Sequence, residues 1–435
     1  MTTYFVLAGV SAPALKFIDR LTERGLTVIA LINRANRSLL DAETYATIEK
    51  KSAAVVTEDL DAPGYARRVT ELTADGELRG IAPTLHIMAL LAAELADHFG
   101  LPGPRPEAIG TALDKASVRR ILADAGLNTV GFLEVTEGRL PEEEAARLSY
   151  PAVVKPTNGF AKIGAALVGS RAELDERTGA FLAEQVGRHA DTGMKSLVGT
   201  ALVIEEFIEG PLFSVECAAD GDGVVGLLAV RRKTNARSPL LELGSSVPGT
   251  QDAQLSAQLT SYAEDVVNAL GLRNCLCHVE IIASADGPCL VEINPRVSGG
   301  AIPDLVANAT GIDLWALLAD VALGGAVAKP PADAEVTAMS HSFLAAEAAF
   351  TAPAGLSGDW FEQAVPDLHS GHCTVVPGQH VGAMDGNYAA FGVVRFADRS
   401  VADAEARCDA AVTALAALLG APLWLPGTAA QERAR

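Results

Sequence analysis

Three polar residues alternate with apolar ones in the stretch "LVEINPRVSGG", residues 290–300. Glu292, Asn294 and Arg296 occupy every second position of a segment that otherwise looks like a buried strand. Because successive side chains of a strand point to opposite faces, this carboxylate, amide and guanidinium share one face. The pattern therefore predicts a group of functional side chains on a half-buried strand.

A second strand upstream supplies a partner for this row. The stretch "CLCHVEIIASADGPCLVEINPR" is typical of two strands joined by a turn, and His278 and Glu280 share a face of the first. If the turn centres near Asp286, Glu280 lies opposite Glu292. Opposed carboxylates repel each other, and burial without a partner raises their pKa. A divalent cation would remove both problems.

The donor types favour a hard, oxygen-seeking cation. The predicted ligands are Glu280, Glu292 and Asn294. Magnesium that bridges substrate phosphates is the usual ion for such a set. Arg296 would then hold a second anion, and the backbone N–H groups of Gly299 and Gly300 would be open to it. The alternative is a solvated face with a chance pair of glutamates, which the apolar flanks disfavour.

Lysine is scarce in this chain, so its positions are informative. The stretch "YPAVVKPTNGFAKIGAALVGS", residues 150–170, predicts a strand, a glycine loop and a second strand. Lys155 ends the first strand, and Lys162 lies in the loop between Gly159 and Gly164. Glycines allow backbone N–H groups to approach phosphate oxygens closely. An ordinary surface turn is the alternative for this segment taken alone.

Three further segments could serve the same ligand. Lys115 and Arg119 lie four residues apart on a helix that begins near Asp114, where a solvated helix face is the alternative. "VRRKTN", residues 230–235, ends a strand in three cations, with an exposed strand end as the alternative. In "LVIEEFIEG", an apolar strand runs into a linker whose backbone and carboxylate groups could recognise an adenine edge.

The elements around these residues indicate an α/β protein. "TYFVLAG", "APALKFIDRLTERG" and "LTVIALI" predict a strand, a helix and a strand, which is a doubly wound opening without the G-x-G-x-x-G fingerprint. "LPGPRPEAIG" indicates a boundary. Helices are predicted in "LSAQLTSYAEDVVNALG", closed by Gly271, and in "VADAEARCDAAVTALAALLG".

Composition excludes several classes of partner. The chain has 435 residues, is 49% hydrophobic and carries a formal net charge of −20. This acidity disfavours nucleic acid and anionic membranes as partners. We find no signal peptide and no apolar run that spans a bilayer, and we interpret the six scattered cysteines as reduced thiols of a cytoplasmic protein. The stretch "HSGHC", residues 369–373, could bind a metal, but a loop is the preferred interpretation.

The order of these motifs resembles the ATP-grasp superfamily over roughly residues 1–400, with "HVEI" and "VEINPR" as the specific part. The resemblance implies an N-terminal doubly wound α/β domain, a central glycine-loop lid and a C-terminal α+β catalytic domain. The implied ranges are 1–110 for the N-terminal domain, 111–208 for the linker and lid, 209–330 for the catalytic subdomain with the metal site, and 331–435 for a segment that completes the catalytic domain.

The stretch "RRKTNARSPLLELGSSVP" is similar to the L-amino-acid ligase branch, whose roles can be carried over position by position. Lys115 and Lys155, with Lys162 and Lys233, resemble cations on the phosphate side. The segment Glu205, Glu206, Phe207 and Ile208 resembles the adenine-holding hinge. Glu280, Glu292 and Asn294 match the magnesium ligands, Arg296 matches the arginine that stabilises the acyl-phosphate, and Glu242 resembles the carboxylate that faces the amino acid.

The sequence departs from that branch at several positions. Leu212 stands in the nucleotide pocket where many members have a ribose-binding acid, so that Glu209 or another group would have to serve. Lys162 replaces a small hydroxyl residue. Ser245 stands where dipeptide ligases often carry histidine, and Gly300 occupies a place that is bulky and aromatic in some relatives. The last two departures imply a roomier or different substrate pocket.

The resemblance implies an ATP-dependent carboxylate–amine ligase that forms an acyl-phosphate and releases ADP and phosphate. Its cofactors would be ATP and Mg²⁺, with Mn²⁺ as a substitute. Its partners would be a small-molecule or short-peptide acid and amine, in a homodimer without nucleic acid or membrane. The alternative is a carboxylase or nucleotide-biosynthesis enzyme of the same fold that uses bicarbonate or formate.

Overall fold

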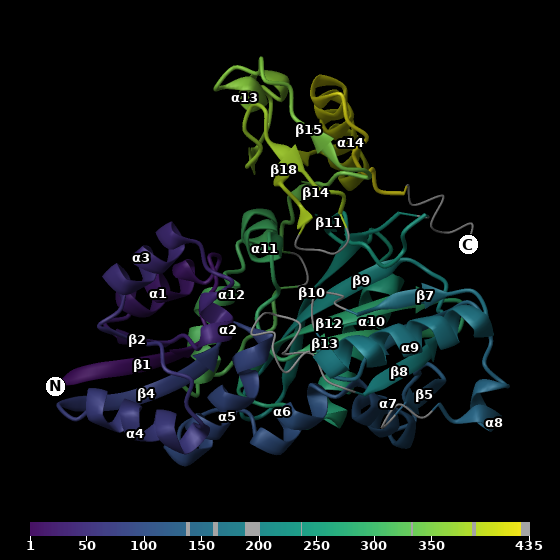
Figure 1. The fold of residues 1–435 in the computed structure, drawn as a ribbon. Coiled ribbons are helices and arrows are strands. Elements are labelled where there is room, and N and C mark those ends of the chain that lie inside the picture. The colour runs from purple at the N-terminus through teal and green to yellow at the C-terminus, as the bar shows by residue number, and fades with distance from the viewer. Residues whose placement is uncertain are drawn as a thin grey trace.

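The computed structural model describes residues 1–135, 140–159, 164–187, 201–235, 237–331, 334–384 and 389–427. These residues form three parts. The N-terminal domain lies beside a large mixed layer of strands and helices, and a smaller C-terminal segment stands over that layer (Figure 1). Lys162 and the C-terminal tail "TAAQERAR" lie outside the described residues.

The N-terminal domain is built on a parallel sheet with the strand order β3-β2-β1-β4. Its strands are β1 (Thr2–Ala8), β2 (Thr27–Leu31), β3 (Ala54–Val56) and β4 (Gly76–Pro83), and its helices are α1 (Leu15–Glu23), α2 (Arg34–Arg37), α3 (Ala42–Lys51), α4 (Ala62–Leu72), η1 (His86–Met88) and α5 (Ala89–His98). The predicted strand–helix–strand opening is confirmed. The strand order reverses beside β1, so the carboxyl ends of β1 and β4 flank the crevice where doubly wound sheets bind ligands.

Two helices lead from this domain to a second, antiparallel sheet. They are α6 (Pro106–Ala112) and α7 (Lys115–Asp124). The sheet has the order β5-β8-β6-β7. Its elements are β5 (Phe132–Val135), α8 (Glu142–Ala145), β6 (Ala152–Pro156), β7 (Ala166–Val168), α9 (Arg171–Gly187) and β8 (Leu202–Glu206). The predicted glycine loop therefore joins β6 to β7.

The third sheet has eight antiparallel strands in the order β13-β12-β9-β10-β11-β14-β18-β16. Its strands are β9 (Leu212–Ala219), β10 (Val224–Lys233), β11 (Gly244–Val247), β12 (Cys275–Ser284), β13 (Gly287–Asn294), β14 (Ala338–Leu344), β16 (Ser370–Cys373) and β18 (Gly392–Asp398). Strands from the predicted ranges 209–330 and 331–435 share this sheet, as a C-terminal segment that completes the catalytic domain requires. The four ranges themselves stay a prediction.

Helices cover both faces of the long sheet. They are α10 (Ala253–Ala269), α11 (Ile302–Thr310), α12 (Leu314–Ala322) and α14 (Val401–Leu419). Helix α10 buries Leu259 and Val266 against β9, β10 and β12. Helix α12 packs on α1 of the N-terminal domain, where Trp315 stacks on Phe17 at 5.9 Å between ring centroids. The N-terminal domain is therefore joined to the long sheet through a shared core.

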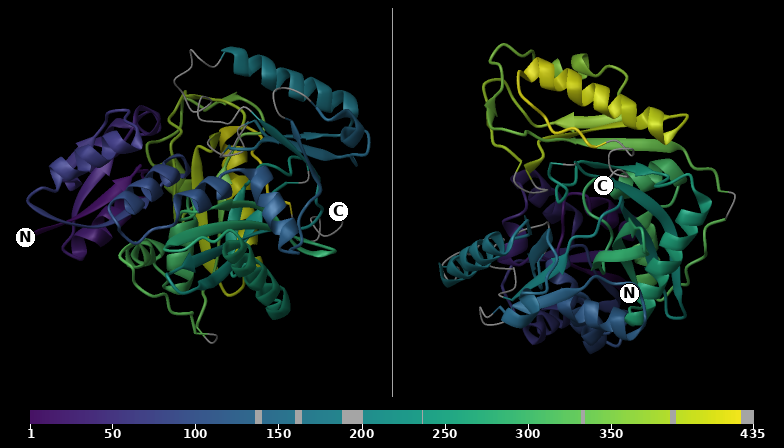
Figure 2. Two further views of the ribbon diagram at one scale, coloured as in Figure 1. Left: turned by 90° about the horizontal axis from the view of Figure 1, so that it is seen from below. Right: turned by 90° about the vertical axis from the view of Figure 1, so that its right-hand side faces the viewer.

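The C-terminal segment adds the small sheet of β15 (Phe350–Thr351) and β17 (His380–Val381) and helix α13 (Trp360–Ala364). Helix α14 packs on β14 and β18, and Figure 2 shows it lying across these strands. The predicted helices around residues 114, 255–270 and 401–419 are confirmed, and Gly271 and Gly420 follow the last two with positive φ angles.

The interpretation of "HSGHC" as a loop is wrong. Residues Ser370–Cys373 form β16, which pairs with β18 at the edge of the long sheet. Among the described residues, no cluster of three or more His, Cys, Asp or Glu side chains is arranged to hold a metal ion. No single described helix is long and apolar enough to cross a bilayer; only Ile302–Thr310 and Leu314–Ala322 taken together would be, and they meet at a 101° bend.

Candidate active site

The hairpin β12–β13 brings the predicted cation ligands together. Its register places Glu280 opposite Glu292 and His278 opposite Asn294. The prediction that the two glutamates face each other is thus confirmed. The strands meet in the turn Ser284–Gly287, where the sequence placed it. Two carboxylates and an amide oxygen therefore lie on one face at the edge of the long sheet, and this donor set suits a hard divalent cation.

A β-bulge at Val291 adds backbone acceptors beside this set. Glu280 pairs with Glu292 but the next residue, Ile281, pairs with Leu290, so that Val291 is the extra residue of β13. Its carbonyl oxygen accepts hydrogen bonds from Arg119 at 2.8 Å and from Lys155 at 3.3 Å. Through this carbonyl, Arg119 of α7 and Lys155 of β6 are hydrogen-bonded to the strand that carries the predicted ligands.

Lys115 lies next to the opposed carboxylates. It is the first residue of α7, whose N-cap Asp114 accepts from the Ser117 N–H, and its backbone N–H donates to Thr157 of the β6–β7 connection. The Lys115 ammonium lies 3.2 Å from a Glu292 oxygen and 3.0 Å from the Gly159 carbonyl. It therefore joins the glycine loop to the predicted cation site.

The same lysine influences the charge state of Glu292. Burial alone would raise the pKa of Glu292, as would the neighbouring Glu280. Lys115, His86 and Lys155 together outweigh both effects and hold the pKa of Glu292 below its usual value. Glu292 is therefore an anion at neutral pH and able to bind a cation.

Arg119 was singled out in the sequence only as a cation on the Lys115 face of its helix, but it lies at the centre of a buried ion network. Its guanidinium donates to one oxygen of Glu205 at 2.9 Å, and Lys155 donates to the other at 2.7 Å. Only 1% of the Arg119 side chain is exposed. The network joins α7, β6 and β8 at one point.

The environment of the ion network shifts the pKa values of Glu205 and Lys155. Burial would raise the pKa of Glu205, but Arg119 and Lys155 together lower it to about 2. Burial lowers the pKa of Lys155 to about 8, although the Glu205 carboxylate opposes that shift. The carboxylate of Glu205 is thus engaged within the protein, which leaves the backbone of the hinge for recognition of a ligand.

A pocket lies between the two antiparallel sheets and contains most of the predicted nucleotide residues. Those that line it are Lys115, Lys155, Glu205, Glu206, Phe207, Ile208 and Leu212. Apolar groups such as Val153, Leu240 and Leu290 form its walls, and Glu292 lines it as well. A flat apolar ligand with an anionic tail that reaches the cation site would fit this distribution. Leu212 contributes an apolar wall, and Glu209 lines the pocket nearby.

Lys233 is placed elsewhere. It is buried on β10, and its ammonium donates to the hydroxyl groups of Ser340 and Ser342 at 2.9 and 2.8 Å. Because Lys233 and Arg232 are neighbours in a strand, they point to opposite faces. Lys233 therefore lies on the face of the sheet covered by α14, apart from the residues that line the pocket.

Arg232 and Glu242 form a buried ion pair on the other face of that strand. Arg232 also contacts His278 Nε2 at 3.0 Å, and Glu216 contacts His278 Nδ1 at 2.6 Å. His278 Nε2 lies 3.4 Å from Glu280. Glu242, the side chain predicted to face the amino-acid substrate, is therefore linked through Arg232 and His278 to Glu280, a predicted cation ligand. The alternative of an exposed strand end at "VRRKTN" is wrong for Arg232 and Lys233, which are both buried.

Arg296 and the glycines lie where β13 meets α11. The Arg296 guanidinium donates to the Val297 carbonyl at 2.9 Å and lies 3.4 Å from Asn294 Oδ1. Gly299 and Gly300 are exposed. Gly300 has φ +61°, and a Cβ atom there would lie 3.8 Å from Phe343. The position therefore has room for a side chain, but its backbone is in the left-handed region that favours glycine.

One residue of this site has no counterpart in the sequence prediction. His86, from the N-terminal domain, lies with Nδ1 3.1 Å from Asn294 Oδ1, and both side chains are buried. Burial lowers the pKa of His86 to about 4. The only sequence signal was its position directly after a predicted strand end in "GIAPTLHIM", which is too weak to identify a partner 208 residues away.

Part of the chain is similar to known proteins. Residues 148–304 match a family described as an ATP-grasp domain. The chain is 28% identical over 291 residues to the uncharacterized protein y4rH of Sinorhizobium fredii, which covers 67% of this chain and 58% of that protein. It is 29% identical over 273 residues to carnosine synthase 1 of Gallus gallus, and this alignment covers 60% of this chain and 29% of that enzyme. The chain thus spans less than two thirds of these relatives' length.

A solved structure extends the likeness to the whole chain. The L-amino acid ligase from Bacillus licheniformis superimposes with a TM-score of 0.77 at 20% sequence identity, over 98% of this chain and 99% of that one. At this identity the match describes the fold. It includes the N-terminal domain, the glycine-loop sheet and the C-terminal segment as well as the matched domain.

Proposed function

We propose that this chain, whose residues 148–304 match an ATP-grasp domain, is an ATP-dependent ligase that joins an amino-acid or related carboxylate to an amine. The observation that carries the proposal is the opposed pair Glu280 and Glu292, of which Glu292 lines a pocket together with Lys115 and Lys155. A nucleotide-binding module without catalysis would not need that pair. The acid and amine would be small molecules or short peptides, and a cytoplasmic homodimer stays a prediction.

The pocket is suited to ATP. Lys115 and Lys155 carry the positive charge expected beside phosphates, and the segment 206–208, which lines the same pocket, offers backbone groups for the adenine edge. Since the Glu205 carboxylate is held by Arg119 and Lys155, its role would be to position Lys155. Lys162 of the glycine loop remains a proposed phosphate contact, and the placement of Lys233 favours a structural role for that residue.

The predicted cation ligands fit magnesium by their chemistry. Glu280, Glu292 and Asn294 would hold the ion, with Mn²⁺ as a substitute. When bound, the ion neutralises charge on the phosphoryl group during transfer. Lys115 lies against Glu292 and partly balances the charge of the two carboxylates. The repulsion between Glu280 and Glu292 therefore supports a site whose purpose is to bind a cation.

The proposed reaction has two steps. A substrate carboxylate attacks the γ-phosphorus of ATP, which forms an acyl-phosphate and releases ADP; an amine then attacks the acyl carbon, and phosphate leaves. Arg296 and the N–H groups of Gly299 and Gly300 lie together in the exposed turn after β13, where they would bind the charged oxygens of the intermediate. Glu242, paired with Arg232, would position groups on the substrate side.

The test of this proposal is a screen of paired acids and amines for ADP release, with mass spectrometry of the products. We expect ADP and phosphate, together with a product whose mass is that of acid plus amine less one water. Release of AMP and pyrophosphate would identify an adenylating enzyme and contradict the acyl-phosphate route. A product that contains only bicarbonate or formate as the new group would favour a carboxylase or formate-using enzyme instead.

The acid pocket leads to a prediction about Gly300. Its open surroundings have room for a large side chain, so Gly300→Trp is expected to raise the KM for bulky acids about tenfold relative to alanine or glycine. A tenfold change corresponds to about 1.4 kcal/mol. The affinity for ATP should stay within about twofold. The measurement is kcat/KM for a series of acids of increasing size.

The positive φ angle of Gly300 requires a matched control. Gly300→Asn introduces a small side chain that tolerates the left-handed region, whereas Gly300→Ala does not. We expect Gly300→Asn to keep the parent's order of preference among acids. If Gly300→Asn changes that order as much as Gly300→Trp does, backbone strain and not pocket volume determines the selectivity.

A further inference from the structure

The N-terminal domain contributes one side chain to the predicted cation site. His86 Nδ1 lies 3.1 Å from Asn294 Oδ1, across 208 residues of sequence. His86 is 7% exposed and Asn294 is 3% exposed. A hydrogen bond between side chains buried to this degree is protected from competition with water. It is therefore a defined link between the N-terminal domain and the strand that carries the ligands.

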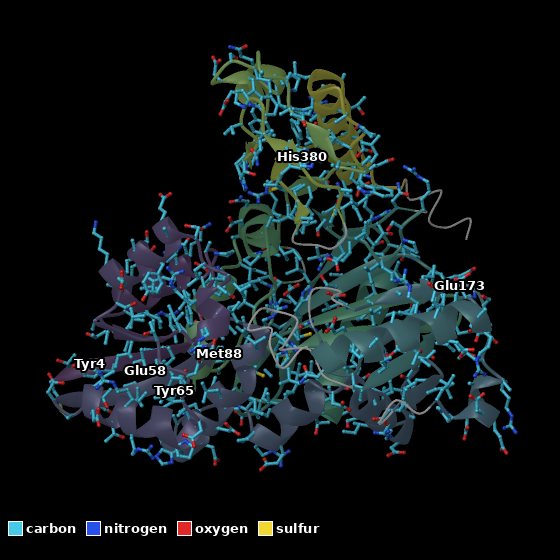
Figure 3. All side chains as sticks on the ribbon, in the orientation of Figure 1. Tyr4, Glu58, Tyr65, Met88, Glu173 and His380 are labelled. Atoms are coloured by element: carbon cyan, nitrogen blue, oxygen red, sulfur yellow. The ribbon has the colours of Figure 1, made fainter. Side chains whose placement is uncertain are left out.

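The loop that carries His86 is held firmly in place. It follows β4 at the reversal of strand order, where the Thr84 hydroxyl donates to the Gly9 carbonyl at 2.8 Å. Met88, two residues after His86, is buried against Gly9, where a Cβ atom would lie 2.8 Å from its Cγ. Figure 3 labels Met88 on the side of the N-terminal domain that faces the long sheet. The imidazole is thus presented from a packed backbone.

The hydrogen-bond pattern determines which atom carries the proton. The Arg296 guanidinium can only donate, and its Nη2 lies 3.4 Å from the same Asn294 atom. That atom must therefore be the amide oxygen. Since an oxygen without hydrogens can only accept, the proton of the shorter contact lies on His86 Nδ1. His86 therefore donates to Asn294 Oδ1.

We propose that His86 is a positioning residue that holds the Asn294 amide with its oxygen toward the cation site, so that the N-terminal domain completes this site. The proposal rests on the function proposed above, in which Asn294 is a ligand. An amide group has one acceptor end and one donor end, and only the oxygen can bind a cation. The His86 bond uses one acceptor direction of that oxygen, and the 3.4 Å contact with Arg296 is long enough to give way to a cation.

The test measures cation binding without turnover. Mn²⁺ is titrated into the full-length protein with saturating ADP, and bound Mn²⁺ is followed by electron paramagnetic resonance. His86→Leu is expected to weaken Mn²⁺ binding by roughly 10–100-fold, the usual effect of removing a partner that orients a metal ligand. His86→Asn is the conservative variant, because its amide nitrogen can take the place of Nδ1. It should restore binding to within about threefold of the parent.

A double-mutant cycle separates this role from a general loss of folding. In an Asn294→Ala background, His86→Leu should have no further effect on Mn²⁺ affinity, because the group that it positions is gone. An equal loss in both backgrounds, or a His86→Asn variant as weak as His86→Leu, would overturn the proposal. If the parent binds no Mn²⁺, both this inference and the proposed metal site fail. If it binds Mn²⁺ but joins no acid to an amine, only the proposed function fails.

Discussion

Glu292→Gln is expected to lower the rate of ADP release by about 10³-fold or more while the protein stays folded. Glutamine keeps the shape of the side chain but cannot supply the negative charge that a divalent cation requires. Stabilisation of a transferring phosphoryl group by a bound ion amounts to several kcal/mol, and each 1.4 kcal/mol is a factor of ten in rate. The measurement is kcat for ADP release with the best acid–amine pair, together with the Mn²⁺ affinity.

The protein should stay folded because Glu292→Gln removes a repulsion between two carboxylates. Glu292 faces Glu280 across the hairpin, and the two carboxylates repel each other. Removing one charge relieves that repulsion, which offsets the loss of the ion pair between Glu292 and Lys115, so the melting temperature should change little. Asp286→Asn is the matched control, since Asp286 is exposed in the turn of the same hairpin. A Glu292→Gln variant with near-normal ADP release would remove the basis of the metal-site assignment.

The ligand pair could be predicted from the sequence because its geometry is local. The period of two in a strand puts Glu292 and Asn294 on one face, and one short turn brings Glu280 close to them. Strict pairing from the turn Ser284–Gly287 would put Glu280 opposite Val291; the bulge at Val291, which the sequence did not predict, brings Glu292 opposite Glu280. The same reasoning placed Lys155 at a strand end before a glycine loop. In both cases the structure confirmed a relation between residues a few positions apart.

Contacts between distant segments could not be predicted in this way. His86 meets Asn294 across 208 residues, and Arg119 meets Glu205 across 86. Neither the period of a strand nor that of a helix contains the information that pairs them. Strand β16 was missed for the same reason, since "SGHC" has little preference for a strand and is held in one by pairing with β18.

The placement of Lys233 shows a further limit. The similarity of "RRKTN" to a family segment predicted a cation near the phosphates, but in a strand adjacent residues point to opposite faces. A shift of one position therefore moves a charge from the ligand side to the α14 side of the sheet. Arg232 contacts Glu242 and His278 on one face, and Lys233 contacts serine hydroxyls on the other.

The second large effect is expected for Glu205→Gln, which should lower the free energy of unfolding by about 3–5 kcal/mol. The change leaves Arg119 and Lys155 as two cations in a buried position without their carboxylate, and breaking one side of a buried ion pair has effects of this size. Glu206→Gln is the matched control, because Glu206 is the next residue on the same strand and is exposed. It should change the free energy of unfolding by less than about 0.5 kcal/mol. Urea unfolding at pH 7 measures both.

The pH dependence of stability tests the same carboxylate independently. The pKa of Glu205 is about 2 in the folded protein and 4.5 as its ordinary value. Because the folded value is the lower one, the contribution to stability is fully present above pH 4.5 and is lost as the pH falls toward 2. Over that window the parent should lose more stability than Glu205→Gln does, by an amount on the order of 3 kcal/mol. Parallel curves for parent and variant between pH 5 and pH 3 would contradict the assignment.

A triple variant separates the structural role of the network from its role in binding. Arg119→Met, Lys155→Met and Glu205→Leu together replace all three charges with apolar groups of similar length. Replacing a whole buried ion cluster in this way is often neutral or stabilising, so the triple variant should unfold at a higher urea concentration than Glu205→Gln alone. It should nevertheless bind ATP at least about tenfold more weakly than the parent, because Lys155 lines the pocket. If the triple variant binds ATP as the parent does, the charges serve the fold alone and Lys155 is not a phosphate ligand.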